Sequence, residues 1–319
     1  MARAGPEPEF NVRVVKRNCA SSTVLALEVT ALDDAALPPW SPGAHVDMLL
    51  PNGLVRQYSL CGRRDDAHRW RFGVLREENG RGGSAYIHDH LKERDVIRLR
   101  GPRNNFELVP ASSYLFIAGG VGITPLLPMI HTVAEGGVPW ILFYGGRSRA
   151  AMTFTDEVTR FSAQTVLWPQ DQCGLLDLDR FLAAPKAGSH IYCCGPEPLI
   201  AAVEDRCRAS GCLGSLHVER FKAAQDPCAE NRVLTVVLRR SNKTVQVGAA
   251  ESILAAVERA GLRPPFSCRE GTCGTCETMV LAGSADHRDA VLTEAERQSG
   301  RTMMICVSRC LGPVLELDL

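Results

Sequence analysis

The chain has 319 residues, of which 45% are hydrophobic and 23% charged, so it is long enough for two or three domains with separate cores. Its 36 basic residues balance 36 acidic ones, which excludes the charge excess typical of proteins that bind nucleic acid or anionic membranes. It shows neither a secretory signal nor an apolar stretch of membrane-spanning length. We expect a cytoplasmic protein, and we expect it to be a monomer.

Residues 1–108 contain short runs in which apolar and polar side chains alternate, as in the segments that begin at Val24 and Trp70. Turn-forming pairs such as Pro42-Gly43 and Asn52-Gly53 separate these runs. Alternation with a period of two is typical of strands that bury one face. We therefore predict an antiparallel Greek-key β-barrel.

Residues 109–222 have a different pattern. Apolar strands at Leu115–Ala118, Trp140–Tyr144 and His190–Cys193 alternate with helical stretches near Leu126–Ala134 and Pro198–Ala209. Strands that alternate with helices are typical of a parallel sheet covered by helices. We predict a nucleotide-binding α/β domain here.

A third domain follows a short break. Ala223–Asn231 is small, polar and without periodicity, so we interpret residues 223–231 as a linker. In residues 232–319, the runs Leu234–Leu238 and Thr244–Val247 indicate a hairpin, and Glu251–Ala260 indicates a helix with a mostly apolar face.

A cysteine cluster lies in the third domain. Cys268, Cys273 and Cys276 have a four-then-two spacing, and Cys306 or Cys310 could supply a fourth thiolate. This spacing is typical of plant-type 2Fe-2S ferredoxins, and nearby glycines would let backbone N–H groups reach the sulfur atoms. A zinc site is the alternative, but such sites usually contain two CxxC pairs and only one is present here.

Two segments of the barrel suggest a flavin site. Arg56–Ser59 lies on a predicted strand, so Arg56 and Tyr58 share one face and Ser59 lies on the other. These side chains could supply a cation for a phosphate, an aromatic plane for the ring and a hydrogen bond near N5. Gly80–Ser84 is a glycine-rich turn before a helical segment, Ala85–Leu91, and its N–H groups could bind the phosphate. The predicted flavin-binding residues are Arg56, Gln57, Tyr58, Ser59, Val74, Gly80, Arg81, Gly82, Gly83 and Ser84, with Ser59 also assigned to catalysis.

The α/β segment carries candidate nicotinamide-binding residues. Gly119–Pro125 connects a strand to a helix, and its glycines would let the backbone approach a pyrophosphate. A second turn, Cys194–Pro196, follows a later strand and could contact the nicotinamide. Arg147 and Ser148 follow another strand and could accommodate a 2′-phosphate. The predicted nucleotide-binding residues are Gly120, Gly122, Thr124, Pro125, Arg147, Ser148, Cys194, Gly195 and Pro196.

With RQYSL, GRGGS, the nicotinamide segment and the C-terminal cysteine cluster in this order, nearly the whole chain resembles the phthalate dioxygenase reductase family, and within it the vanillate O-demethylase reductases. The resemblance implies a C-terminal β-grasp 2Fe-2S ferredoxin domain, FMN as the flavin, and NADH as the usual donor, with NADPH as the alternative. It also selects Cys306, which precedes Val-Ser-Arg, as the fourth ligand and leaves Cys310 for packing. Glu219 and Phe221 match the end of the family's nucleotide domain near the flavin. Cys194, assigned to catalysis with Ser59, would position the nicotinamide sterically, and a buried structural thiol is the alternative.

Together these sites predict a converter between a two-electron and a one-electron carrier. A nicotinamide delivers a hydride, a 2Fe-2S cluster accepts single electrons, and a flavin does both. We therefore predict the reductase of a Rieske-type aromatic oxygenase or O-demethylase. The alternatives are a stand-alone flavin reductase or oxidase, which would need no cluster, and a non-enzymatic redox sensor, which would need no nicotinamide site.

Overall fold

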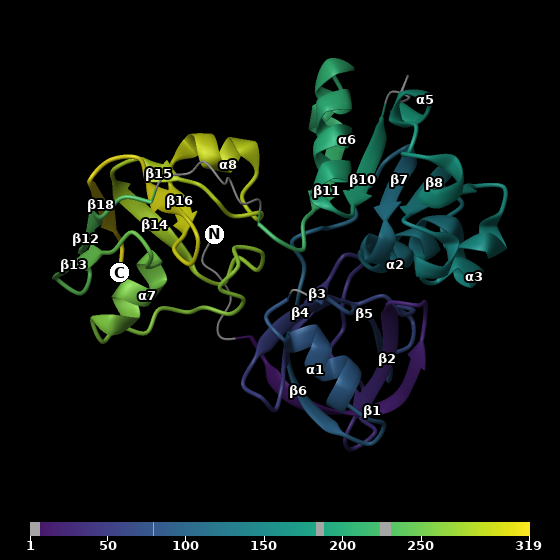
Figure 1. Cartoon of the computed structure of the whole chain (residues 1–319), viewed down its shortest axis with the longest axis horizontal. Coiled ribbons are helices and arrows are strands. Elements are labelled where there is room, and N and C mark those ends of the chain that lie inside the picture. The colour runs from purple at the N-terminus through teal and green to yellow at the C-terminus, as the bar shows by residue number, and fades with distance from the viewer. Residues whose placement is uncertain (1–6, 79, 183–187, 224–230) are drawn as a thin grey trace. The chain divides into compact units, whose positions relative to one another are not determined.

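A computed structural model describes residues 7–78, 80–182, 188–223 and 231–319. Its contacts divide the chain into two units, Met1–Glu219 and Arg220–Leu319. The first unit contains two of the predicted domains and the second contains the third (Figure 1). Most of the predicted linker, residues 224–230, lies outside the described residues.

The N-terminal part of the first unit is an antiparallel barrel, as predicted. Its six strands have the order β4-β3-β6-β1-β2-β5, and a bridge between Leu60 and Phe72 connects the end of β4 to β5. The elements are β1 Glu9–Cys19, β2 Val24–Ala31, β3 His45–Leu49, β4 Val55–Ser59, β5 Trp70–Leu75, α1 Gly83–His90 and β6 Val96–Arg103. Alternate side chains such as Val12 and Val14 point into the barrel, and Trp70 fills its core.

The rest of this unit is a parallel five-stranded sheet with the order β11-β10-β7-β8-β9. Its strands are β7 Ser113–Gly119, β8 Trp140–Gly146, β9 Thr165–Pro169, β10 Ser189–Cys194 and β11 Leu216–Glu219. The α-helices are α2 Ile123–Glu135, α3 Thr155–Val158, α4 Gln170–Cys173, α5 Leu178–Leu182 and α6 Glu197–Ala209, and the 3-10 turns are η1 Gly120–Gly122, η2 Arg149–Ala151, η3 Thr159–Phe161 and η4 Leu213–Ser215.

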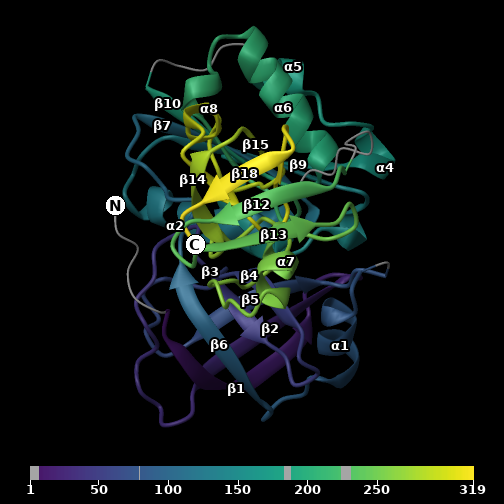
Figure 2. The same ribbon diagram turned by 90° about the vertical axis from the view of Figure 1, so that its left-hand side faces the viewer.

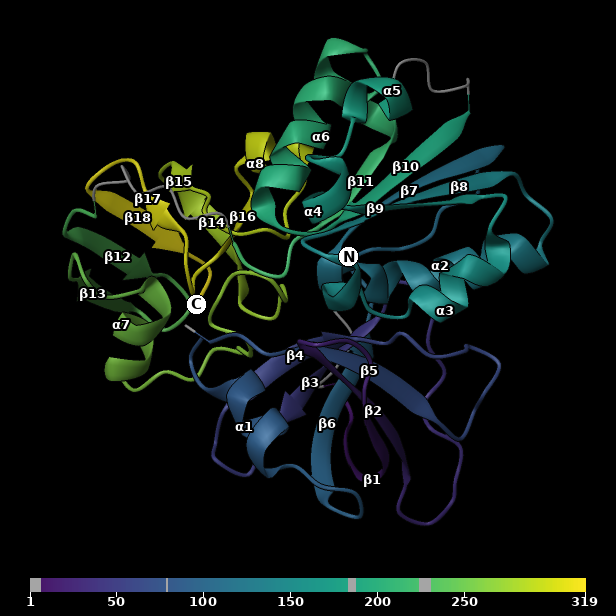
Figure 3. The same ribbon diagram turned by 45° about the vertical axis from the view of Figure 1, so that its right-hand side comes forward.

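Alternation along β7 explains why helices cover both faces of this sheet. Phe116 packs with α2, whereas Ile117 packs with α5 and α6 on the opposite face (Figure 3). Strand β7 lies between β10 and β8. The chain adds β8 and β9 on one side of β7 and then returns to add β10 and β11 on the other side. Ligands of open α/β sheets bind at such a switch point, outside the carboxyl ends of the strands.

The second unit contains a five-stranded sheet with the order β13-β12-β18-β14-β16, in which β12 and β18 run parallel. This mixed sheet around one helix is the β-grasp arrangement that the family resemblance implies. Its elements are β12 Leu234–Leu238, β13 Lys243–Val247, α7 Ile253–Arg259, β14 Glu277–Ala282, β15 Ala285–Asp286, α8 Glu294–Ser299, β16 Thr302–Met304, β17 Arg309–Cys310 and β18 Val314–Leu317. Helix α7 packs on the sheet through Ile253, Leu254 and Val257 (Figure 2).

Two helix boundaries differ from the sequence-based expectation. Helix α7 begins at Ile253 rather than Glu251, because the Ser252 hydroxyl accepts the Ala255 N–H at 3.1 Å and caps the helix. Helix α1 begins at Gly83, so the glycine-rich turn runs into the helix itself. Among the described residues, no helix has the length and apolar character needed to cross a membrane.

Candidate functional site

The structure brings the two predicted flavin segments together. The Arg56 guanidinium on β4 donates a hydrogen bond of 2.9 Å to the Arg81 carbonyl in the glycine-rich turn. A Cβ atom on Gly83 would lie 2.5 Å from the Arg56 side chain, so glycine lets the arginine lie against the first turn of α1. Gly82 caps this helix with a φ of +79°, a conformation that glycine adopts readily. A cation and the first N–H groups of a helix therefore meet at one place, which suits a phosphate.

The other residues of β4 have separate surroundings. Tyr58 packs partly on the barrel core, and Ser59 is buried. The Gln57 amide donates to the Asp47 carboxylate at 3.1 Å, and the fully buried Asp47 also accepts two bonds from Arg100. Gln57 thus holds the strand in place, and its side chain amide is engaged with Asp47.

Two further predicted flavin residues are tied into the scaffold. The Val74 side chain is fully buried in the barrel core, and its carbonyl accepts a 2.8 Å bond from His88. Its side chain is therefore part of the barrel core, and its assignment to the flavin site stays a prediction. The Ser84 hydroxyl accepts the Glu77 N–H at 3.0 Å, and a hydroxyl that accepts one bond can still donate its proton to a phosphate. Gly80 closes the same turn by donating to the Glu77 carbonyl at 3.3 Å.

The predicted nucleotide loops also lie against each other. A Cβ atom on Gly122 would lie 2.2 Å from the Cys194 carbonyl oxygen, and one on Gly195 would lie 3.0 Å from the Gly119 Cα. Side chains at these positions would push the two turns apart. Thr124 and Pro125 are buried where α2 begins, and the Thr124 hydroxyl donates to the Val121 carbonyl at 2.8 Å.

Tyr144 supports this loop, and sequence reasoning missed it. It is fully buried on β8, its hydroxyl lies 3.0 Å from the carbonyl oxygens of both Gly120 and Thr153, and it accepts the Thr153 N–H at 2.9 Å. Burial raises the pKa of Tyr144, which keeps the hydroxyl protonated and able to donate. Only its place at the end of an apolar strand, next to Gly145-Gly146, could have drawn attention to it.

A carboxylate and a thiol lie beside the second nucleotide loop. The Cys194 thiol is 4.0 Å from Glu219 at the end of the neighbouring strand β11. Burial, reinforced by the Glu219 charge, raises the pKa of Cys194 well above its ordinary value. Burial also raises the pKa of Glu219, to about 8. A protonated thiol is a poor nucleophile, which agrees with a steric role for Cys194.

The remaining predicted nucleotide and flavin residues are placed as follows. Arg147 is exposed after β8, and the Ser148 hydroxyl accepts the Ala151 N–H at 3.3 Å, which caps η2. Phe221 is partly exposed and belongs to the C-terminal unit, so its assignment to the flavin site stays a prediction.

The four predicted cluster ligands are close together and buried. The neighbouring thiols shift one another's pKa, lowering those of Cys268 and Cys276 and raising those of Cys273 and Cys306, because the four side chains face one another. The donor set and its burial fit an iron-sulfur cluster.

The loop around these thiols aims backbone N–H groups at sulfur. Cys268 accepts from the N–H groups of Glu270 at 3.3 Å and Thr272 at 3.5 Å. Gly271 has a φ of +71°, and a Cβ atom there would lie 2.6 Å from Val307, so only glycine permits the close turn. Cys310 lies on β17 and donates instead to the Val314 carbonyl at 3.4 Å.

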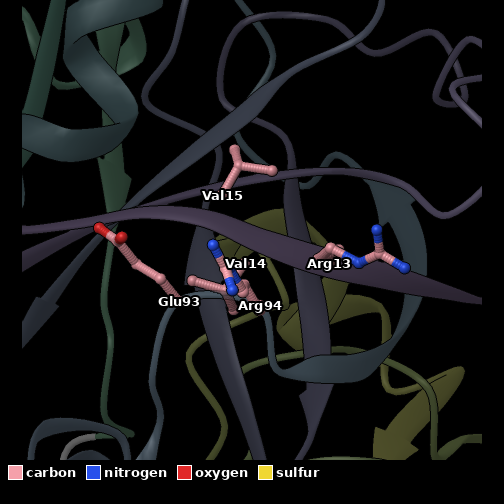
Figure 4. Close-up of a pocket in the computed structure, with 5 residues that line it drawn as sticks. All are labelled: Arg13, Val14, Val15, Glu93 and Arg94. Atoms are coloured by element: carbon pink, nitrogen blue, oxygen red, sulfur yellow. The ribbon is translucent and has the colours of Figure 1, made fainter.

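A separate hollow of about 640 Å³ opens on the barrel and is lined by Arg13, Val14, Val15, Glu93 and Arg94 (Figure 4). None of the residues predicted to bind flavin, nucleotide or iron lies among them. The redox sites described above are therefore formed by the strand ends and glycine turns and do not coincide with this hollow.

Known proteins resemble the chain in its parts and over its whole length. Residues 116–173 match the oxidoreductase NAD-binding domain family, and residues 236–311 match the 2Fe-2S iron-sulfur cluster binding domain family. The phenoxybenzoate dioxygenase subunit beta of Ectopseudomonas oleovorans is 39% identical and is covered over 100% of both chains. The phthalate dioxygenase reductase of Burkholderia cepacia is 36% identical over 97% of each chain.

Solved structures give the same result. The crystal structure of a phthalate dioxygenase reductase matches 98% of each chain with a TM-score of 0.74 and 34% identity. An intact type IV self-sufficient cytochrome P450 monooxygenase matches with a TM-score of 0.87 and 37% identity. The chain covers 43% of that longer protein, so the likeness concerns only part of it.

The barrel, the α/β domain and the four-thiol loop define a flavin- and iron-sulfur-dependent NAD(P)H oxidoreductase. Such a protein passes electrons from NADH through a flavin and a 2Fe-2S cluster to an oxygenase. The chain belongs to the phthalate dioxygenase reductase family of oxygenase reductases.

Proposed function

We propose that this reductase serves a Rieske-type oxygenase or O-demethylase that acts on an aromatic substrate. The observation that carries the proposal is the group of Cys268, Cys273, Cys276 and Cys306, four buried thiols that would give the chain a one-electron outlet in addition to its proposed flavin and nucleotide sites. The full-length likeness to the reductase subunits named for phthalate, phenoxybenzoate and toluene-4-sulfonate oxygenases supports the aromatic class.

In the proposed flavin site, Arg56 and the N–H groups of Gly82–Ser84 hold the FMN phosphate. Bound FMN would supply the conversion between hydride transfer and one-electron transfer, because a flavin can accept a hydride and can release electrons singly. Ser59 would donate a hydrogen bond to the flavin ring, and Tyr58 would offer it an aromatic surface. Cys194 limits where the nicotinamide ring can lie, while Glu219 beside it holds a proton near neutral pH.

In the proposed iron site, Cys268, Cys273, Cys276 and Cys306 bind two irons. Four thiolates, two for each iron, are what a 2Fe-2S cluster requires, and the single CxxC pair is less typical of a structural zinc site.

The proposal includes a monomer that works in the cytoplasm with NADH as its donor. The thirteen cysteines of the chain would stay reduced in that compartment. Exposed Arg147 leaves NADPH as the alternative donor. We assign residues 1–108 to FMN, 109–222 to the nucleotide and 232–319 to the cluster, with 223–231 as the linker.

A cytochrome P450 is the second candidate for the partner. The structural match to a self-sufficient P450 monooxygenase covers 100% of the present chain at 37% identity. The same electron outlet could therefore serve a haem enzyme.

One experiment separates these partners. The purified holoprotein is mixed with NADH and either a Rieske oxygenase or a P450, and substrate oxidation is measured against NADH consumption. We expect coupled turnover with the Rieske enzyme. If NADH consumption were coupled to substrate oxidation only with the P450, the P450 would replace the Rieske oxygenase as the proposed partner. If NADH reduced oxygen without substrate oxidation by either enzyme, the result would favour a stand-alone oxidase.

A further inference from the structure

An ion pair joins the barrel to the α/β domain. Arg71 on β5 forms a two-point contact with Glu157 on α3: one nitrogen pairs with Oε1, and Nη2 lies 2.9 Å from Oε2. The two side chains are only 20% and 21% exposed. Because water is largely excluded and both oxygens are engaged, this pair is held more rigidly than an ordinary surface salt bridge.

The same arginine is bonded to the end of the proposed flavin strand. Arg71 Nη2 donates to the Cys61 carbonyl at 2.6 Å, and the Cys61 N–H donates to the Arg71 carbonyl at 2.9 Å. Cys61 follows Ser59 by two residues. The guanidinium therefore connects the segment that carries Ser59 directly to α3.

On the other side of the ion pair, α3 is connected to the proposed nucleotide loop. The Arg71 guanidinium lies over the Phe154 ring, 4.7 Å from its centre, and Phe154 precedes α3 with a φ of +54°. The preceding residue, Thr153, bonds to the Tyr144 hydroxyl, which also lies 3.0 Å from the Gly120 carbonyl oxygen. The ion pair is thus connected to the nucleotide loop through the segment Thr153–Phe154 and the Tyr144 hydroxyl.

Close packing supports the same connection. A Cβ atom on Gly73, which lies on β5 two residues after Arg71, would be 2.7 Å from the Thr124 methyl group and 3.1 Å from the Phe154 ring. Strand β5 therefore packs directly against the beginning of α2 and against Phe154. A shift of α3 along β5 would move the nucleotide loop relative to the flavin strand.

We propose that Arg71 and Glu157 are positioning residues, whose ion pair sets the approach of the nicotinamide ring to the flavin ring. The inference rests on the flavin and nucleotide sites proposed above. Neither side chain touches the reacting atoms; each acts through Cys61 or through the segment from Thr153 to Glu157. Small displacements of reacting groups slow such transfers strongly, because the geometry of approach determines the barrier.

The charges around Glu157 define a mild way to break the pair. His131 on α2 also faces it, with Nε2 4.0 Å from Oε2, and burial lowers the pKa of His131 and favours the neutral imidazole. Arg71 is thus the cation that balances Glu157. Glu157→Gln removes the charge with little change of shape and leaves Arg71 bonded to Cys61 and stacked on Phe154.

The test compares Glu157→Gln and Arg71→Lys with Glu135→Gln in the full-length holoprotein. Glu135 forms the matched control because it pairs with Arg63 across the same two domains, but with side chains 61% and 57% exposed. Stopped-flow absorption gives the saturating rate of flavin reduction, the dissociation constant of NADH, and the long-wavelength charge-transfer band between reduced flavin and NAD+. Thermal unfolding is recorded for each variant.

For Glu157→Gln we expect the saturating rate to fall about ten-fold and the charge-transfer band to weaken, with NADH affinity changed less than about two-fold. Arg71→Lys keeps the charge but loses the two-point contact, so its rate should fall less. Glu135→Gln should match the unmodified protein. A less stable Glu157→Gln protein with an unchanged rate and band would overturn the proposal and leave the pair a purely structural role. Failure of the unmodified protein to bind FMN or NADH would instead overturn the proposed function.

If Glu157→Gln does not fold, Arg71→Lys decides the question by the same rate and band. An unchanged rate and band in that variant would contradict a positioning role.

Discussion

The Cys194 thiol lies 4.0 Å from the Glu219 carboxylate, and the two residues are paired at the ends of neighbouring parallel strands. Both groups keep their protons near neutral pH, because burial raises the pKa of each. The nicotinamide end of the proposed site is therefore bordered by uncharged groups, which a neutral dihydronicotinamide can approach without displacing a bound counter-ion.

Glu219→Gln should change how stability depends on pH. The pKa of Glu219 rises from an ordinary value of 4.5 to about 8 on folding, so between these values the folded state holds a proton that the unfolded state has released. The free energy of unfolding therefore falls as pH rises through this window. We expect the melting temperature of the unmodified protein to fall more between pH 5.5 and 8 than that of Glu219→Gln. If the melting temperatures of the two proteins changed equally with pH, Glu219 would have an ordinary pKa.

Arg56→Ala should weaken FMN binding by roughly ten-fold or more, because a charge-assisted bond to the phosphate is lost. Arg76→Ala is the matched control, because the exposed Arg76 guanidinium pairs with Asp89 of α1, whereas that of Arg56 bonds to the glycine-rich turn. FMN retained after gel filtration, measured by absorption, compares the two variants. If Arg56→Ala retained as much FMN as the unmodified protein, Arg56 would not bind the FMN phosphate.

Ser59→Ala should slow hydride transfer while FMN stays bound. The buried Ser59 hydroxyl would stabilise the charge that develops near N5, and removing one such donor costs roughly 100- to 1000-fold in rate. Single-turnover reduction by NADH measures this rate separately from FMN content. If Ser59→Ala and the unmodified protein were reduced by NADH at the same rate, Ser59 would not be a catalytic residue.

Cys306→Ser and Cys310→Ser should differ sharply. Cys306 is buried beside Cys268 and Cys276, whereas the Cys310 thiol donates to a backbone carbonyl on β18. Analysis of iron and sulfide should give about two of each per chain for Cys310→Ser and far less for Cys306→Ser. The reverse result would make Cys310 the fourth ligand.

A fragment of residues 1–222 should bind FMN and oxidise NADH with ferricyanide, because the barrel and the α/β domain each have a core. It should not support the oxygenase, since the one-electron outlet is missing. Substrate oxidation by the partner enzyme is measured with the fragment and with the full-length protein. Equal rates of substrate oxidation would show that the cluster is dispensable.

Local sequence determined the domain types and most of the chemistry. The spacing of Cys268, Cys273 and Cys276 lies within nine residues, and strand alternation and helix period are local properties of the chain. For this reason the barrel, the α/β domain and the glycine-rich turns could be predicted from local patterns, whereas the β-grasp fold of the third domain was implied by the family resemblance. Short-range patterns also put Ser59 and Gly83 among the candidates, although they could not show what surrounds each one.

Tertiary structure decided which of these residues meet. Arg56 reaches the Arg81 carbonyl 25 positions away, and Arg71 pairs with Glu157 86 positions away. Cys306 turns towards Cys268 and Cys276, while Cys310, four residues later, turns to β18. No local pattern encodes these contacts, because each depends on how separately formed strands and helices pack. Packing also decided that the Gln57 amide bonds to Asp47 and that the Val74 side chain lies in the barrel core.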